Sequence, residues 1–348
     1  MKTINIMTSC DGNLMKFIPV QLESISANLT NRQINFYLFH DGKNQNFVNK
    51  LKKIKYANIV FKDIVVKDID VYEQIAKYGG NWCGAAYYSL CAYEYLPVDM
   101  DRILYLDAAD ILVIGNIDEY YFDDFDGKML IVTALRYKLK NNQTGLYKTD
   151  DIFNGAQPYS KEDLSDGTYF AEIAHGIFNS GSYVINLNKM RQQNNNINNY
   201  FDCAKVLYDL KEHIPKDYFK GKTNLGNWGD QVYWGDQGFL SLVFVGDVKY
   251  FAYPKIINTV YMPYNFGLWY FNKVIENLFY PISIIHYTGD GAFKPWQAKY
   301  DKFLKYFQNK NRLYALDTIN PNIVKCYNIW YQYALMAEKR LNQYKIKY

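Results

Sequence analysis

Several features that would place this chain in a common functional class are missing. It has no run of about eighteen apolar residues that could cross a membrane as a helix. Its five cysteines are scattered, odd in number and without close pairing, which argues against a disulfide framework and against a zinc site. The first ten residues contain no apolar core of the signal-peptide type. We therefore expect a cytoplasmic protein.

The usual phosphate-binding motifs are also absent. No Gly-x-Gly-x-x-Gly follows the first predicted strand, and no P-loop occurs anywhere in the chain. A nucleotide would therefore depend on a metal ion to neutralise much of its phosphate charge. The net charge of +4, from 39 basic and 35 acidic residues, is too small to indicate a nucleic-acid partner.

The chain is instead rich in apolar and aromatic residues. Of its 348 residues 49% are hydrophobic, which is ample for a large core, and the length allows one large α/β domain with additions. The 35 tyrosines suit surfaces that contact sugar rings or other proteins, although many must belong to the core.

Alternating strand and helix patterns predict the fold. Residues 3–9, 34–40 and 58–61 have the pattern of strands, and a helix rich in lysine is expected at about 45–55. Ile18, Leu22, Ile25 and Leu29 recur at helical spacing between the first two strands. This order predicts an α/β fold with a Rossmann-like, mostly parallel central sheet flanked by helices. Ligands of such sheets bind at the carboxyl ends of the strands.

Two aspartates follow a buried strand in the middle of this pattern. Asp107 ends the apolar run 103–106, and Asp110 precedes the next apolar run, 111–114. Carboxylates at the end of a buried strand are costly without a positive partner, and a hard divalent cation is a natural one. The alternative is a polar turn between two strands, since aspartates are common in turns.

Polar residues later in the chain allow similar pairs of interpretations. Asp236 precedes an apolar helix at 238–245, where it can cap the helix or serve a site. His286 ends the strand 283–286, where it can be structural or a ligand, and the glycines and Lys294 that follow suit a loop near phosphates. We also expect a helix at 85–96, strands at 128–134 and 177–187, and a long polar loop at 138–170.

Taken together and in this order, these motifs resemble the family-8 glycosyltransferases, which include glycogenin and bacterial lipopolysaccharide α-galactosyl- and α-glucosyltransferases. The resemblance runs from the first strand to Trp296. It rests on Asp11 with Asn13, Leu104-Tyr105-Leu106-Asp107, Phe178-Asn179-Ser180-Gly181 followed by Ile185-Asn186-Leu187, Asp236-Gln237 before an apolar helix, and His286 followed by Lys294-Pro295-Trp296.

The resemblance implies a GT-A fold, with a nucleotide-sugar-binding half at about 1–136, an acceptor-binding half at about 137–297 and a helical C-terminal extension at 298–348. It also implies a Mn²⁺ or Mg²⁺ ion. Asp107, Asp110 and His286 match its protein ligands, and we expect Asp110 to bind it directly and Asp107 to contact the ion or the ribose.

The same resemblance assigns residues to the UDP-sugar donor. Asp11 and Asn13 match residues that contact the uridine, Lys294 matches the lysine on the diphosphate, and we expect Ser9 and Gly289 beside them. Around the donor sugar the matching residues are Asn179, Asp236 and Gln237, with Gln237 near the face of the anomeric carbon opposite the leaving group.

The chain departs from the family pattern at several places. Asp107 and Asp110 are separated by two alanines, whereas the family has Asp-x-Asp, so that both acids reach one ion only through a bulge or a different turn. The segment Tyr87-Tyr88-Ser89-Leu90 lies where the family usually has an arginine. Ala134-Leu135-Arg136 lies where many members have an aspartate at the donor sugar.

We therefore predict a metal-dependent, retaining hexosyltransferase. It would move glucose or galactose from a UDP-sugar to a cell-surface glycan, glycolipid or glycoprotein. The alternative is a weak or inactive homologue that binds a nucleotide-sugar or a partner without turnover.

The C-terminal segment combines aromatic residues with Lys339, Arg340, Lys345 and Lys347. A basic aromatic helix suits the interface of an anionic membrane. The alternative is a helix packed on the domain with a frayed basic end.

Overall fold

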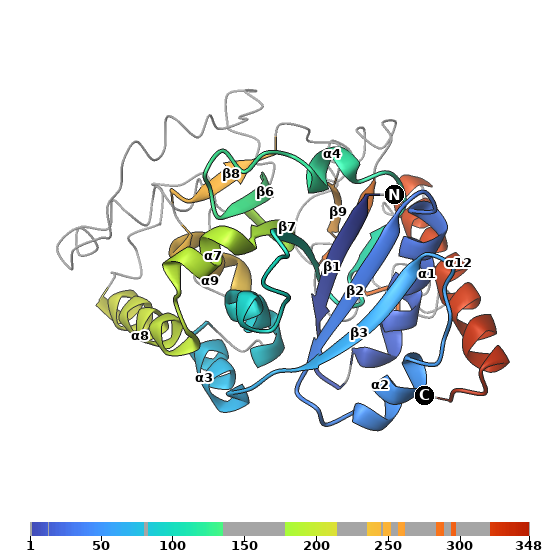
Figure 1. The fold of residues 1–348 in the computed structure, drawn as a ribbon, viewed down its shortest axis with the longest axis horizontal. Helices are drawn as coiled ribbons and strands as arrows, with labels where there is room; N and C mark the ends of the chain where they lie inside the picture. The colour runs from blue at the N-terminus through green and yellow to red at the C-terminus, as the bar shows by residue number, and fades with distance from the viewer. Residues whose placement is uncertain are drawn as a thin grey trace, which may run out of the picture.

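The protein forms a large mixed sheet covered by helices, with a smaller sheet beside it (Figure 1). The structure is a computed structural model. The predicted loop at 138–170, Asn13 and Gly289 lie outside the residues that it describes. Those residues are 2–12, 14–79, 83–134, 178–213, 235–244, 246–251, 257–261, 283–288, 294–296 and 321–347.

The large sheet has seven strands, and four of the six pairings among them are parallel. The antiparallel pairs are those that β7 makes with β4 and β6. The mostly parallel sheet expected from the alternating pattern is therefore confirmed. In spatial order its strands are β3 (Ile59–Val65), β2 (Gln33–His40), β1 (Thr3–Ser9), β4 (Arg102–Leu106), β7 (Phe178–Asn186), β6 (Leu130–Ala134) and β8 (Val248–Tyr250).

The central strands are buried on both faces, so their side chains alternate between two cores. In β4, Ile103 and Tyr105 belong to one core, whereas Leu104 and Leu106 belong to the other. Continuous apolar runs are typical of strands covered on both sides by helices. The burial of β4 fixes the point at which the chain must turn polar, which is Asp107.

Helices of different chain regions cover the two faces. The first core contains apolar side chains of α3 (Ile69–Gly79), η2 (Gly84–Glu94), α7 (Leu187–Gln193), α8 (Ile197–His213) and α9 (Gly235–Val243). The second contains those of η1 (Met15–Phe17), α1 (Ile18–Asn28), α2 (Gln45–Leu51) and α4 (Asp118–Tyr121).

Several expected elements differ in detail from those observed. The helix expected at 85–96 is a 3-10 helix, η2, with a kink at Cys91, where the backbone has φ −121° and ψ 31°. The strand expected at 58–61 continues to Val65, because β3 pairs with β2 along its whole length. Pairing of this kind depends on a strand distant in sequence, which local patterns do not reveal.

The small sheet places a distant part of the chain beside the aspartates. Its central strand β10 (Ile284–Thr288) pairs antiparallel with β5 (Ile111–Val113) and parallel with β9 (Ile257–Tyr261). His286 lies opposite Ile111, the residue after Asp110. This pairing fixes the position of His286 relative to the aspartates.

The C-terminal helix α12 (Pro321–Gln343) packs along α1 (Figure 1). Trp330 is buried, and Leu341 and Ile346 join the core beneath α1. Arg340 pairs through its guanidinium with Glu23, whose side chain is 1% exposed. These residues of the C-terminal segment therefore pack on the domain, as expected from the second of the two interpretations of this segment. None of the helices in the described parts of the chain is long and apolar enough to cross a membrane.

The Arg340–Glu23 pair makes the docking of α12 testable. Replacing Arg340 by Met should lower the free energy of unfolding by about 3 kcal/mol, because a buried carboxylate loses its counter-charge. The matched control is Arg32→Met, which breaks the half-exposed pair with Asp118 and should cost at most about 1 kcal/mol. Urea unfolding at unchanged m-value measures both. Equal losses would contradict a structural role for the buried pair.

Candidate active site

The predicted site residues meet at the carboxyl edge of β1 and β4. These strands are parallel neighbours, so the residues that follow them emerge side by side. Ser9 ends β1 and Asp11 follows it, while Asp107 comes directly after β4. The backbone N–H of Asp107 donates to the carbonyl of Gly181 in β7 at 2.9 Å. Ser9, Asp11 and Asp107 therefore lie at the same edge of the sheet.

A tight turn accommodates the extra alanine between the two aspartates. The backbone N–H of Asp110 donates to the carbonyl of Ala108 at 2.7 Å, and Ala109 between them has φ 65°. This is a γ-turn with a left-handed central residue, a conformation that costs about 1–3 kcal/mol outside glycine. The carbonyl of Asp110 accepts the N–H of Tyr287 at 2.8 Å, which ties the turn to β10.

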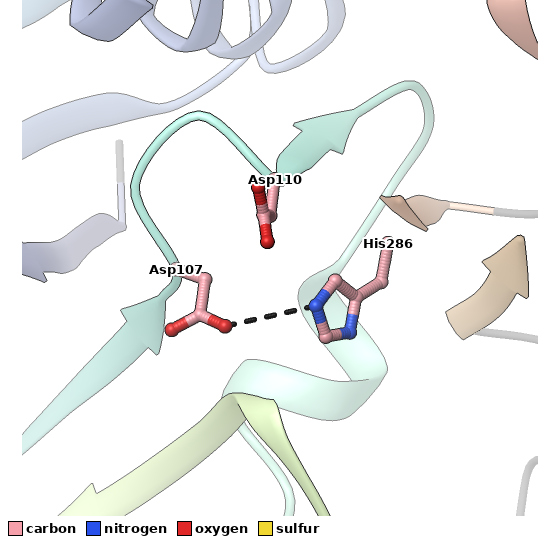
Figure 2. Close-up of side chains that lie close together, drawn as sticks. All are labelled: Asp107, Asp110 and His286. Atoms are coloured by element: carbon pink, nitrogen blue, oxygen red, sulfur yellow. Dashed lines mark ion pairs between the residues drawn. The ribbon is translucent and has the colours of Figure 1, made fainter. Parts of the chain in front are cut away.

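Because of this turn, both carboxylates face one imidazole. Figure 2 shows Asp107, Asp110 and His286 directed toward a common space. One possible ligand atom from each residue lies within 4.8 Å of the others. Nε2 of His286 is 3.6 Å from Oδ2 of Asp107. Two carboxylate oxygens and an imidazole nitrogen form a donor set that suits a divalent cation such as Mn²⁺.

Gly181 makes room for His286. A Cβ at this position would lie 2.2 Å from Cε1 of the imidazole and 2.7 Å from both ring nitrogens. No side chain tolerates such distances, so His286 can occupy its place only because β7 has glycine there. This explains the glycine of the Phe178–Gly181 motif.

The electrostatics of the cluster also fit a cation. Burial, and then the charges of Asp236 and Asp110, raise the pKa of Asp107 well above its usual value. Burial raises the pKa of Asp110 in spite of the opposing charge of Lys294. Burial, followed by the charge of Lys294, lowers the pKa of His286 to about 3, so the imidazole is neutral at pH 7, which is the form that binds metal ions. Among the described residues, Asp107, Asp110 and Asp236 would together carry more negative charge than Lys294 offsets if all three were ionised, and a divalent ion would favour their ionised forms.

Lys294 places a positive charge beside the carboxylate of Asp110. Its ammonium group forms an ion pair with Asp110 and donates to the carbonyl of Tyr287 at 2.7 Å. The same group lies 5.4 Å from the ring centre of Trp296. Phe17 of η1 and Trp330 of α12 pack against Trp296, with ring centres 5.3 and 5.9 Å from that of Trp296. α12 therefore supports Trp296, which lies beside the ammonium group of Lys294.

Asp236 lies at the start of α9 and also acts electrostatically on Asp107. It lies in the first turn of α9, where its carboxylate accepts backbone N–H groups of residues 236 and 237 and the hydroxyl of Ser180. It is also close enough to Asp107 for its charge to raise the pKa of that carboxyl. Asp236 thus lies in the first turn of α9, where a carboxylate is favoured, and its charge acts on Asp107. Gln237 beside it is half-buried.

The remaining predicted residues are described in part. Ser9 is buried, and its hydroxyl shares a hydrogen bond of 3.2 Å with the hydroxyl of Tyr105. Asp11 is half-buried, and its charge contributes to the raised pKa of Cys10, for which burial is the larger cause. Asn179 lies in β7, but its side chain is outside the description, as are Asn13 and Gly289.

Two residues that hold Asp107 in place were not among the predicted site residues. The side-chain amide of the buried Gln21 donates to the carbonyls of Asp107 at 2.9 Å and Ile111 at 3.4 Å, and so spans the turn. The hydroxyl of Tyr105 donates to Oδ1 of Asp107 at 2.9 Å. An amide on the buried face of the helix at 18–28 is a signal that could have identified Gln21.

Aromatic residues occupy the region where the family usually has arginine. The buried hydroxyl of Tyr87 has no hydrogen-bond partner among the described residues, and its ring packs on Phe239 of α9 with centres 5.6 Å apart. Ser89 hydrogen bonds with the hydroxyl of Tyr183 at 2.6 Å. The segment therefore joins the aromatic core behind the cluster.

The chain is similar to two curated bacterial glycosyltransferases. A lipopolysaccharide 1,2-glucosyltransferase of Escherichia coli is 24% identical over 358 aligned residues, which cover 99% of this chain and 85% of that protein. A second, from Escherichia coli strain K12, is 27% identical over 129 residues, or 37% of this chain and 38% of that protein.

Solved structures show the same fold. The galactosyltransferase LgtC, crystallised with donor and acceptor sugar analogues, matches with a TM-score of 0.55 at 20% identity, over 88% of this chain and 94% of that one. The sequence profile described as "Glycosyl transferase family 8" matches residues 5–300, a span that includes Asp107, Asp110, His286 and Lys294. With its mostly parallel sheet and a match over most of its length, the chain belongs to glycosyl transferase family 8 and has the GT-A fold.

Proposed function

We propose that this glycosyltransferase is a retaining hexosyltransferase that depends on a divalent cation. Its donor would be UDP-glucose or UDP-galactose, and its acceptor a cell-surface glycan, glycolipid or glycoprotein. The observation that supports this most directly is the meeting of Asp107, Asp110 and His286 beside Lys294 and Asp236. These groups supply a cation site, a positive charge for a diphosphate and a polar wall for a sugar.

The residues of the cluster suit Mn²⁺ or Mg²⁺. When bound, such an ion would offset the negative charge of the diphosphate and make it a better leaving group. Lys294 contributes to the same charge balance. Its ammonium group rests on Asp110 in the free protein, and we expect it to turn to a phosphate oxygen once the cation takes over the neutralisation of that carboxylate.

The donor sugar would lie between the cluster and the start of α9. Asp236 is held by its own helix and by Ser180, so its carboxylate is fixed in position to accept hydrogen bonds from sugar hydroxyls. Gln237, the next residue, would face the anomeric carbon, and Asn179 of β7 would line the other side. We further propose that residues 1–136 hold the nucleotide-sugar and 137–297 the acceptor.

Two routes give retention of configuration, and the residues present allow both. The transition state resembles an oxocarbenium ion, as in glycoside cleavage. Attack on the same face as departure, with the leaving phosphate as base, requires only positioning by Asp236, Gln237 and Asn179. A double displacement requires a nucleophile, for which Gln237 or Asp236 is the candidate.

A contact with the membrane surface is a separate proposal for α12. α12 exposes Leu335 and Met336, to 65% and 42%, and Tyr344 just beyond its end is exposed to 36%. Lys339, Lys345 and Lys347 are exposed beside them. Apolar side chains bordered by lysines suit the interface of an anionic bilayer. We propose that α12 brings the enzyme to the inner face of the membrane.

The metal dependence predicts the effect of Asp110→Asn. Hexose transfer, measured as UDP release from UDP-glucose and UDP-galactose, should fall about a thousandfold, which corresponds to about 4 kcal/mol of lost transition-state stabilisation. Thermal stabilisation by UDP with Mn²⁺ should disappear as well. Asp101→Asn, at the opposite end of β4 with a side chain 58% exposed, should behave like the wild type. Wild-type protein that binds UDP and Mn²⁺ but releases no UDP from any donor would favour the binding-module alternative.

The close approach of Gly181 to His286 predicts that Gly181→Ala weakens Mn²⁺ binding. We expect the affinity to fall by at least about tenfold, because the imidazole must leave its place or β7 must shift. Gly127→Ala is the control, since a Cβ there meets nothing within 4 Å while the φ of 73° still strains alanine. Titration with Mn²⁺ should separate the two variants. Unchanged affinity in Gly181→Ala would show that His286 is not a ligand.

The membrane proposal predicts a loss of binding when Lys339, Lys345 and Lys347 are all replaced by Glu. Each lysine near an anionic surface contributes about 1 kcal/mol, so binding to vesicles with anionic lipid should fall by at least about a hundredfold. The matched control replaces Lys50, Lys67 and Lys77, which are also exposed, by Glu. Point changes are preferable to truncation, which would remove Arg340, Leu341 and Ile346. Equal binding by both triple variants would refute the proposal.

A further inference from the structure

A buried tyrosine lies directly behind the first aspartate of the cluster. The hydroxyl of Tyr105, in β4, donates to Oδ1 of Asp107 at 2.9 Å. The other oxygen of that carboxylate, Oδ2, faces His286, with 3.6 Å between Oδ2 and Nε2. The two oxygens of Asp107 therefore have different partners, one in the protein core and one at the cation site.

The ring of Tyr105 cannot move away from this position. It is stacked on the ring of Tyr183, with centres 4.8 Å apart and an angle of 20° between the planes. Both side chains are fully buried in the core between the sheet and η2. A phenol held in this way fixes the orientation of the carboxylate to which it donates.

The two stacked tyrosines differ in what their hydroxyls do. The hydroxyl of Tyr183 hydrogen bonds with Ser89 of η2 at 2.6 Å, within the core. The hydroxyl of Tyr105 reaches the site. Tyr105 and Tyr183 therefore have the same size, are similarly buried and stack on each other, but only the hydroxyl of Tyr105 hydrogen bonds with a residue of the cluster.

We propose that Tyr105 is a positioning residue for the divalent cation, which it serves by holding Oδ1 of Asp107 so that Oδ2 alone is presented as a ligand. This inference rests on the cation dependence in the proposed function. It implies that Asp107 binds the ion through one oxygen. Residues that orient a metal ligand in this way typically account for about 10–100-fold of the metal affinity.

The proton of the Tyr105 hydroxyl determines the direction of the neighbouring hydrogen bond. A phenol has one proton, and here it is given to Asp107. When Asp107 is ionised, as it must be to bind a cation, the serine is therefore the donor in the bond of 3.2 Å between Ser9 and Tyr105. With its own proton committed, the Ser9 oxygen can only accept a hydrogen bond from a ligand. A uracil N–H or a ribose hydroxyl provides such a donor at the nucleotide side of the site.

The chain from Ser9 through Tyr105 to Asp107 links the nucleotide side of the site to the cation. Successive hydrogen bonds in a buried chain strengthen one another. A donor group of the nucleoside on Ser9 would strengthen the bond of Tyr105 to Asp107 and so favour the cation. We therefore expect uridine and Mn²⁺ to bind with positive cooperativity, although uridine has no phosphate to share with the ion.

The decisive comparison is between Tyr105→Phe and Tyr183→Phe. Each variant keeps the stacked rings and loses one buried hydroxyl, so both should show a similar drop in melting temperature. Free Mn²⁺, measured by its paramagnetic resonance signal without nucleotide, should show affinity reduced about 10–100-fold in Tyr105→Phe and unchanged within about twofold in Tyr183→Phe. Equal affinities in the two variants would overturn the inference.

A second variant covers the case in which Tyr105→Phe does not fold. Ser9→Ala removes the donor to Tyr105 while leaving the ring in place, and should abolish the cooperativity between uridine and Mn²⁺. Retained cooperativity in this variant would refute the link.

The wild type separates this inference from the proposed function. If it binds no Mn²⁺ or Mg²⁺, both fail. If it binds Mn²⁺ and the two phenylalanine variants behave alike, the role of Tyr105 fails while the hexosyltransferase proposal stands.

Discussion

The constraint on which the site depends is the placement of two half-buried carboxylates at the end of a strand that has no polar face. β4 is enclosed by two cores, which fixes Asp107 and the turn after it at the edge of the sheet. Lys294 supplies one positive charge against Asp107, Asp110 and the nearby Asp236. The structure around them holds the excess negative charge in place: Gln21 spans the turn, Tyr105 orients one carboxylate, and Gly181 admits a neutral imidazole. Such an arrangement is stable enough to persist and gains most from a cation.

Much of the fold and the identity of the site could be predicted from the sequence. The alternation of strands and helices gave the mostly parallel sheet, and the polar residues that end strands marked its carboxyl edge. His286 was recognised by its order relative to Asp107 and Lys294. Its pairing with the segment after Asp110 is a contact between residues over 170 positions apart, which no local pattern contains. The ordered set of motifs therefore predicts which residues share a site but not how they are arranged.

What the sequence did not reveal depends on geometry at the level of single bonds. The extra alanine between Asp107 and Asp110 is accommodated by a γ-turn centred on Ala109. This turn leaves a carboxylate oxygen of each aspartate within 4.8 Å of the other and of a ring nitrogen of His286. Nothing in Asp-Ala-Ala-Asp predicts a left-handed alanine, because that conformation is unfavourable for alanine and is held by the bonds of Asp107 to β7 and of Asp110 to β10. Tyr105 looked like one of many core aromatics, and only its hydroxyl distinguishes it from Tyr183.

The C-terminal helix packs behind the candidate site, although the family profile ends at residue 300. Tyr331 of α12 donates to the carbonyl of Pro295 at 2.9 Å, and Trp330 packs on Trp296. The hydroxyl of Tyr287, the residue after His286, donates to the carbonyl of Cys326 at 2.6 Å. α12 therefore supports both the strand that carries His286 and the segment that carries Lys294, while Arg340 ties it to Glu23 of α1. α12 thus lies behind His286 and Lys294 and also exposes a basic, partly apolar surface. In the proposed enzyme, this helix would set the distance between that surface and the candidate active site.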